Sequence, residues 1–334
     1  WREVAGSTAR GIDEKSYALQ SQIKVVTQHL ERNGRRAEVA PSPLVPGMLR
    51  VRNALTLPRP LVSIVIPTRD RHDLLQTCVS SLFEKTKYRE FELIVVDNES
   101  IEKATKLYLD QIQLEMGVRV LRAEIPFNYS TLNNLGVSQA KGDYVLLLNN
   151  DIEITNEDWL EEMLGWAQLS ETGCVGAKLW YPNNTVQHAG VILGINGLAG
   201  HVYRGISRFD TGYQGRASVH QNISAVTGAC ILVKKSIYEE VGGLDEQFAV
   251  AYNDIDFCLR VQAAGYQNVW TPYAEMIHHE SATRRPDTDP VRRARLEKEV
   301  GLMNERWGEI IKNDPAYSCN LTRVNEDYSI KVHA

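Results

Sequence analysis

The sequence predicts an α/β fold with a doubly wound, mostly parallel sheet, an N-terminal helical lead-in and a C-terminal helical extension. Short, nearly all-apolar runs at residues 62–66, 93–96 and 144–148 are typical of strands that are buried on both faces. The segments between these runs place apolar residues at helical spacing. Strands that alternate with helices in this way form a parallel sheet.

The composition narrows the class of protein before any motif is considered. The chain has 334 residues, of which 43% are hydrophobic and 24% charged, as in an ordinary globular protein. A formal net charge of -5 argues against a nucleic-acid partner. The five cysteines are scattered and form no C-x-x-C pair, so we expect buried free thiols rather than disulfides or zinc. No apolar run approaches the about 20 residues that span a bilayer.

The first 60 residues are predicted to be an accessory lead-in. Apolar residues at helical spacing predict a helix over 11–33 that Gly34 ends, and five prolines then interrupt the approach to Leu61. The chain begins with Trp1 rather than Met, so we expect it to be part of a larger multidomain protein.

The first half of the predicted sheet follows the lead-in along the chain. After the strand at 62–66, Asp70 is predicted to cap a helix with one apolar face. That face comprises Leu74, Leu75, Cys78, Val79 and Leu82. The remaining elements expected in this half are strands at 93–96, 118–121 and 144–148 and helices at 101–112 and near 131–140.

The second half is less regular. Thr155 is predicted to open a helix that buries Trp159, and a strand over 175–179 continues the sheet. Residues 181–225 are rich in Gly, Asn and His without a clear period, which predicts loops and hairpins. A helix that begins near Asn253 and a strand over 269–277 complete the predicted core.

Three polar clusters follow three of the predicted strands, at residues 67–70, 97–100 and 149–153. Taken singly, each could be a turn or a helix cap. The carboxyl ends of parallel strands meet at one edge of a sheet, where ligands bind in a crevice. Together the clusters therefore predict a single polar site.

Several sequence motifs, taken together in their order along the chain, are specific enough to indicate a family. They are VSIVIPTRDR, IVVDNES, FNYSTLNNLG, GDYVLLLNNDIEI, VGAKLWYPNNTVQHAGVILG, TGACILVKKS, GGLDEQF, NDIDFCLRVQAAGY and IHHES. Over residues 61–321 the chain resembles the inverting glycosyltransferases of family 2, which have the GT-A fold, and within them bacterial O-antigen and rhamnan-type sugar transferases. The resemblance implies a GT-A domain at 61–285, with a nucleotide-binding half (61–155) and an acceptor-binding half (156–285), and a helical extension at 286–334.

The resemblance also implies a nucleotide-sugar site. Its expected residues are Pro67, Thr68, Arg69, Asp97, Asn133, Asn150 and Arg284. A carboxylate at a strand end, such as Asp97, is a rigid acceptor for a base, and the planar fork of Arg284 suits a diphosphate. The alternatives are a turn residue at Asp97, a helix cap at Asn133 and an ordinary surface arginine at Arg284.

The metal motif of the family, Asp-x-Asp, corresponds to Asn149-Asn150-Asp151, so Asp151 is the one carboxylate left there. Because a diphosphate brings its own oxygens, Asp151 with phosphates and waters can satisfy Mg²⁺ or Mn²⁺. The resemblance implies that His278 completes the shell of ligands, and imidazole favours manganese over magnesium. A buried, hydrogen-bonded histidine is the alternative for His278, and Glu153 is the other candidate ligand.

The resemblance assigns the catalytic base to Asp254. Inverting transfer needs a carboxylate beside the acceptor hydroxyl to take its proton. An aspartate in the first turn of a helix also stabilises the helix dipole, which is the structural alternative. The family's Glu before the base is Asn253 here. Residues expected to contact the acceptor are Gln187, His188, Gly228 and Asn253.

These features predict an enzyme that moves a sugar, with rhamnose as one candidate, from a dTDP- or UDP-sugar to a hydroxyl of a bacterial surface polysaccharide. The expected acceptor is an oligosaccharide or a lipid-linked glycan of O-antigen or lipopolysaccharide biosynthesis. The expected location is cytoplasmic, at the periphery of the inner membrane.

Other classes of protein fit less well. A dehydrogenase would carry G-x-G-x-x-G after the first strand, where this chain has Pro67-Thr68-Arg69-Asp70. A sugar nucleotidyltransferase would place a Gly-rich loop and a lysine there. A non-catalytic module that binds glycans or nucleotide sugars is the main alternative, because two motif acids have become asparagine.

Overall fold

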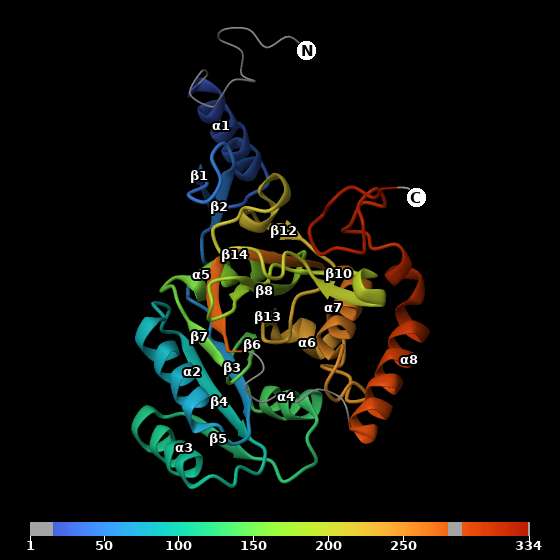
Figure 1. Ribbon diagram of the computed structural model, residues 1–334. Coiled ribbons are helices and arrows are strands. Elements are labelled where there is room, and N and C mark those ends of the chain that lie inside the picture. The colour runs from blue at the N-terminus through green and yellow to red at the C-terminus, as the bar shows by residue number, and fades with distance from the viewer. Residues whose placement is uncertain (1–15, 280–288, 333–334) are drawn as a thin grey trace.

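A central twisted sheet with helices on both faces forms the body of the protein (Figure 1). The computed structural model describes residues 16–279 and 289–332. At one end of the body a helix and a hairpin project away, and the long C-terminal helix lies along one side (Figure 1). The predicted α/β class is therefore confirmed.

The first half of the main sheet is parallel, as predicted. Its strands are β3 (Val62–Thr68), β4 (Phe91–Asp97), β5 (Arg119–Arg122) and β6 (Tyr144–Leu148). Its helices are α2 (His72–Lys85), α3 (Lys103–Met116) and α4 (Tyr129–Ser138). Every residue of β3 and β6 is buried, which explains why these strands lack the alternation of polar and apolar residues.

The second half contains a reversal that sequence periodicity does not reveal. Its strands are β7 (Ile152–Ile154), β8 (Thr172–Trp180), β9 (Val186–His188), β12 (Gln221–Asn222), β13 (Cys230–Lys234) and β14 (Gln267–His278). Along the sheet the order is β12-β14-β8-β13-β6-β3-β4-β5. β13 runs antiparallel to both β6 and β8, whereas β8 and β14 pair in parallel. The start of β13 therefore lies at the same edge as the ends of its neighbours.

Helices and short hairpins complete this half. The helices are α5 (Trp159–Ala167), α6 (Lys235–Glu240), α7 (Asn253–Ala263) and α8 (Pro290–Lys312). The region from 181 to 225 holds short strands and turns, including β10 (Val191–Leu193), η2 (Ile195–Gly197), β11 (Ala199–His201) and η3 (Tyr213–Ser218). Its hairpin character was predicted, but Val186, Ile192 and Val202 are fully buried and belong to the main core.

Two predicted helix caps are wrong. Asp70 does not cap α2, because its Oδ1 accepts hydrogen bonds from the amides of Ile101 and Glu102, just before α3, at 2.7 and 2.8 Å. Thr155 donates to the carbonyl of Glu275 at 2.6 Å instead of capping α5. In both cases a partner distant in the sequence has taken the side chain that local spacing assigned to a cap.

The lead-in contains more structure than predicted. Helix α1 (Ser16–Arg32) is confirmed within the described residues, and an unpredicted hairpin of β1 (Ala37–Pro41) and β2 (Leu49–Asn53) follows it. Arg50 and Arg52 of β2 form ion pairs with the buried carboxylate of Glu162 on α5. The hairpin is thereby attached to the sheet domain.

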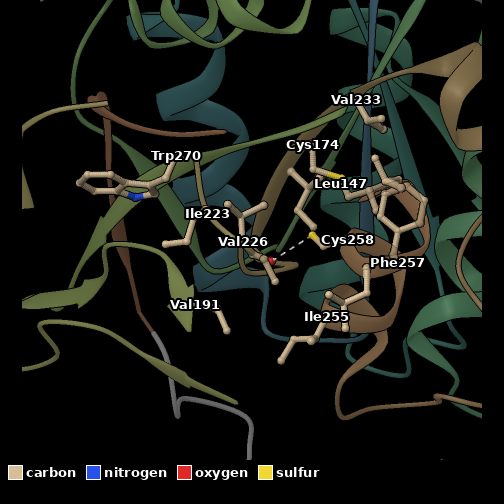
Figure 2. Packing of buried hydrophobic residues seen from close by; sticks show 14 of the residues in the cluster. Leu147, Cys174, Val191, Ile223, Val226, Val233, Ile255, Phe257, Cys258 and Trp270 are labelled. Carbon is tan, nitrogen blue, oxygen red and sulfur yellow. Dashed lines mark hydrogen bonds between the residues drawn. The ribbon is translucent and has the colours of Figure 1, made fainter. Parts of the chain in front are cut away.

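The core beneath α7 is shown in Figure 2. Ile255, Phe257 and Cys258 of α7 point into a cluster that includes Val226. The thiol of Cys258 lies 3.8 Å from the carbonyl oxygen of Val226, to which it donates. Four cysteines are buried free thiols, as predicted, and Cys319 is exposed and also free. Within the described ranges, no helix combines the length and apolar character needed to cross a bilayer.

Candidate active site

A cavity of about 870 Å³ opens at the edge of the sheet where β3, β6 and β14 end and β13 begins. Because β13 runs antiparallel to its neighbours, the turn that precedes β13, rather than the end of a strand, lies at this edge. The polar and ionisable residues of the lining are Thr68, Arg69, Tyr129, Asn149, Asn150, Asp151, Gln187, His201, Thr227, Tyr252, Asn253, Asp254, His278, Arg292 and Arg295. Many of the residues predicted from the sequence therefore meet in one place.

Asp151 and His278 lie side by side. Their Oδ1 and Nε2 atoms are 3.1 Å apart, and both side chains are largely buried. The cause is the pairing of β7 with β14, in which His278 is opposite Ile152, the residue after Asp151. Two segments more than a hundred residues apart are thus joined by one strand register.

The pair fits a divalent cation. Asp151 Oδ1 is buried and accepts no hydrogen bond from the part of the chain that the structure describes. Adjacent ligand atoms at about 2.1 Å from an octahedral ion are about 3 Å apart, close to the observed separation. No cluster of three or more His, Cys, Asp or Glu side chains suited to a metal occurs among the described residues. Protein ligands would therefore have to be supplemented by phosphate and water oxygens.

Glu153, the other candidate ligand, has different partners. One of its carboxylate oxygens lies 3.1 Å from His279 Nε2 and the other 3.5 Å from Lys85 Nζ. Neither Glu153 nor His279 lines the cavity. The adjacent histidines therefore separate into His278, which faces Asp151, and His279, which faces Glu153.

The ends of β3 and β6 are connected across the cavity wall. The side-chain amide of Asn150 donates to Thr68 Oγ1 at 2.9 Å. Pro67 and Arg69 line the same wall, and Arg69 is exposed. These four predicted donor-site residues are brought together.

Asp97 and Asn133 lie behind the wall. Asp97 is opposite Thr68 in the β3–β4 register, and its carboxylate accepts a 2.6 Å hydrogen bond from Arg122. Asn133 is fully buried on α4 and donates to the carbonyl of Tyr129 at 2.8 Å. Neither residue lines the cavity, and Arg284 lies outside the described residues.

Asp254 is held at the first turn of α7 and is partly exposed to the cavity. Its Oδ2 accepts a hydrogen bond from the amide of Gly228 at 2.7 Å, and its Oδ1 accepts one from the amide of Ile255 at 2.9 Å. A Cβ atom added at Gly228 would lie 3.3 Å from Asp254 Cβ, so glycine permits this close approach.

The surroundings of Asp254 suit a base. Burial raises the pKa of its carboxyl above the ordinary value, although the Gly228 amide and the charge of His201 oppose the shift. A base is more effective when its pKa is closer to the pH at which it works. The carboxylate also has both oxygens ordered by backbone amides.

Tyr129 is a site residue that the sequence reasoning missed, although it lies within the quoted motif FNYSTLNNLG. Its hydroxyl donates to the Gly228 carbonyl at 2.7 Å, so α4 in the first half contacts the Thr227-Gly228 turn in the second half. Burial raises the pKa of the Tyr129 hydroxyl, which keeps it protonated as a donor. Asn253 also lines the cavity and donates to the Val250 carbonyl at 3.1 Å.

The residues expected to contact an acceptor divide into two groups. Gln187, Gly228 and Asn253 line the cavity. His188 does not, because it is fully buried, and its Nδ1 lies 3.2 Å from Nδ1 of His201, which does line the cavity. Burial lowers the pKa of His188 well below the ordinary value and so keeps it neutral.

Helix α8 adds two arginines to the rim, Arg292 and Arg295. In the sequence they are typical of a solvated helix face, and contact with an anionic lipid-linked acceptor is the alternative. They are 39% and 32% exposed, so they border the cavity while remaining accessible to water. Only the packing of α8 against α7 reveals this position.

Comparisons with known proteins identify relatives of this chain by sequence. A family model described as "Glycosyl transferase family 2" matches residues 63–242. An uncharacterized protein of Sinorhizobium fredii, y4gI, is 45% identical over 98% of this chain. The O-antigen biosynthesis protein RfbC of Myxococcus xanthus is 36% identical over 98% of this chain. The chain spans 36% of the first protein's length and 25% of the second's.

Solved structures share the fold. GalNAc-T7 with UDP, GalNAc and Mn²⁺ matches with a TM-score of 0.60 at 16% identity, covering 76% of this chain and 50% of that one. The mannosyltransferase PcManGT from Pyrobaculum calidifontis, in complex with GDP-Man and Mn²⁺, matches with a TM-score of 0.53 at 16% identity. That match covers 86% of this chain and 74% of the other.

Proposed function

Because the chain belongs to glycosyltransferase family 2 and has the GT-A fold, we propose that it transfers a sugar with inversion from a dTDP- or UDP-sugar to a hydroxyl of a bacterial surface polysaccharide. The observation that carries the proposal is one cavity in which Asp254 lies with the Asp151–His278 pair and the Thr68–Asn150 contact. A base, a cation site and a polar strand edge are the parts that such a reaction needs.

In the proposed reaction Asp254 takes the proton of the acceptor hydroxyl. The acceptor oxygen forms a bond to the anomeric carbon while the bond from that carbon to the diphosphate oxygen breaks. Asp151 and His278 would hold Mn²⁺ or Mg²⁺, which when bound stabilises the negative charge of the departing diphosphate. Arg292 and Arg295 add positive charge to the rim, which also suits a diphosphate.

The nature of the acceptor is part of the proposal. RfbC is named for O-antigen biosynthesis. A short match, 38% identical over 56 residues, is to the N-acetylglucosaminyl-diphospho-decaprenol L-rhamnosyltransferase of Mycobacterium tuberculosis. These names support a glycan acceptor, with a lipid-linked form and rhamnose among the candidates. A reaction at the cytoplasmic face of the inner membrane is a further part of the proposal.

The first test replaces the base. Asp254→Asn keeps the shape of the side chain and removes the proton acceptor, so turnover should fall by about 100-fold or more. Binding of dTDP or UDP with Mn²⁺, measured by calorimetry, should stay at the wild-type level. Near-normal transfer by the variant would show that Asp254 is not the base.

A second test separates an enzyme from a non-catalytic binding module. dTDP-rhamnose and a panel of UDP-sugars are incubated with the protein, and released dTDP or UDP is measured with and without a synthetic lipid-linked acceptor. Release that EDTA stops and Mn²⁺ or Mg²⁺ restores is the expected result. Binding of these donors with no release under any condition would favour the binding module.

A further inference from the structure

The loop before α7 ends at Tyr252, two residues before Asp254, the proposed base. Tyr252 has a left-handed backbone conformation, with φ of 62°. On one side the loop contacts α4, where the amide of Tyr129 donates to the Ala249 carbonyl at 2.8 Å. Because a non-glycine residue is strained in this conformation, neighbouring contacts must hold the turn.

On the other side the loop is held by Glu299 of α8. Glu299 is fully buried, and its Oε1 accepts a hydrogen bond from the amide of Val250 at 3.0 Å. Its Oε2 accepts one from the amide of Ala251 at 3.2 Å. Arg295 Nε lies 3.8 Å from Oε2 and offsets the buried charge. Burial of a carboxylate costs free energy unless hydrogen bonds and a nearby positive charge compensate for the lost water, and here the two loop amides and Arg295 do so.

The same helix also holds α7 from the far side of Asp254. Asp256 is fully buried, and its Oδ1 accepts hydrogen bonds from Arg306 Nη1 at 3.1 Å and from Trp307 Nε1 at 3.0 Å. Arg306 and Trp307 belong to α8, as Glu299 does. The short segment that bears Asp254 is therefore bound to α8 both before and after that residue.

We propose that Glu299 is a positioning residue that acts through the backbone of the loop to hold Asp254 against the Gly228 amide, with α8 as the support. Glu299 lies outside residues 63–242, the part matched by the family model. The proposal rests on the proposed function, because it assigns Glu299 a purpose in placing the base. A displacement of about 1 Å at a reacting group can cost about 100-fold in rate.

The experiment compares Glu299→Gln with Glu297→Gln. Glutamine has one acceptor oxygen where two amides need one each, so the loop should loosen. Glu297 lies on the same helix, but its side chain is 67% exposed and pairs with Arg293 on the surface, which makes it the matched control. Amide hydrogen exchange is measured first, since it requires no substrate.

Loss of protection at Val250 and Ala251 in Glu299→Gln should extend to the Gly228 amide, which reports the position of the Asp254 carboxylate. In the release assay with dTDP-rhamnose or a UDP-sugar, kcat should fall by about 10- to 100-fold while the donor KM stays unchanged. The acid limb of the pH profile should move to lower pH, because a carboxyl that swings toward water loses the burial that raises its pKa. The lost hydrogen bond from the Gly228 amide acts in the opposite direction, but burial is the largest influence on the pKa of this carboxyl, and the charge of His201 on β11 still favours its ionised form.

The proposal is overturned if exchange increases at Val250 and Ala251 alone while Gly228 stays protected, or if the pH profile of Glu299→Gln equals that of wild type. If Glu299→Gln does not fold, Arg306→Gln loosens the attachment of Asp256 from a half-buried position and should shift Gly228 exchange in the same direction. Asp254→Asn is assayed in parallel. If Asp254→Asn stays active, the proposed function fails, whereas a dead Asp254→Asn with a normal Glu299→Gln rejects the positioning role alone.

Discussion

At the scale of single residues, the site is governed by what surrounds each carboxylate. Asp151 has a buried oxygen without a hydrogen-bond donor among the described residues, and it faces His278. Asp254 has both oxygens bound by backbone amides. Asp256, only two residues further on, is fully buried and bound by Arg260, Arg306 and Trp307. Three similar side chains thus lie in three different environments, which suit a proposed cation ligand, a proposed base and a structural residue.

The pH dependence of turnover follows from the environment of Asp254. A base must be ionised, and burial raises the pKa of this carboxyl, so activity should be lost as the pH falls through a value above the ordinary value of about 3.9. The measurement is a pH profile of kcat at two Mn²⁺ concentrations. A limb that belongs to metal binding moves with the Mn²⁺ concentration, whereas the Asp254 limb does not.

A midpoint at or below about pH 4 would contradict this assignment, because it would describe an ordinary exposed carboxyl. Circular dichroism at each pH serves as the control, since acid unfolding would also remove activity. Asp254→Asn should show no such limb in its residual rate.

At the scale of elements, the lead-in hairpin behaves as part of the sheet domain. Arg50 lies 4.1 Å above the ring of Tyr273 in β14 and forms an ion pair with Glu162 in α5. Gln168 at the end of α5 donates to the Ala54 carbonyl just after β2, at 2.6 Å. We therefore propose a domain boundary earlier than residue 60, at or before the start of the hairpin.

Removal of the hairpin contact should destabilise the whole domain. Arg50→Ala leaves the buried Glu162 with Arg52 as its remaining close partner, so the free energy of unfolding should fall by about 1–3 kcal/mol. Urea denaturation followed by fluorescence measures the change. Lys87→Ala is the control, because its ion pair with Glu157 is exposed on both sides and should matter by less than about 0.5 kcal/mol. Equal effects of the two variants would mean that the hairpin is an independent unit.

At the scale of the whole molecule, the cavity joins segments that are remote in sequence. Thr68 comes from the end of β3, Gly228 from the turn before β13, and His278 from the end of β14. A ligand that contacts all of these strand ends must stabilise the folded chain over the unfolded chain, because the unfolded chain cannot assemble the site.

Nucleotide and metal should therefore raise the melting temperature together. With dTDP or UDP plus Mn²⁺ at about 100 times the dissociation constant, the stabilisation should be about 2.7 kcal/mol. His278→Ala should lose the part of the increase that depends on Mn²⁺, whereas the neighbouring His279→Ala should keep it, since His279 faces Glu153. Differential scanning fluorimetry with EDTA as the baseline measures both variants. Equal losses would remove His278 as a metal ligand.

Local patterns in the sequence predict most of the helices and strands. The buried runs at β3, β4 and β6 were predicted because a strand covered on both faces needs an unbroken apolar stretch, whatever its neighbours are. The family resemblance pointed to Asp151, Asp254 and His278, and the structure places all three on one cavity. Their roles remain predictions.

Tertiary structure alone decided how distant segments meet. The reversal of β13, the β7–β14 register that joins Asp151 to His278, and the bonds from Glu299 to the loop before α7 have no local signature. Asp70 and Thr155 were misassigned for the same reason, since partners far along the chain took their side chains. Periodicity depends on neighbouring residues, whereas pairing and positioning depend on which surfaces the complete fold brings together.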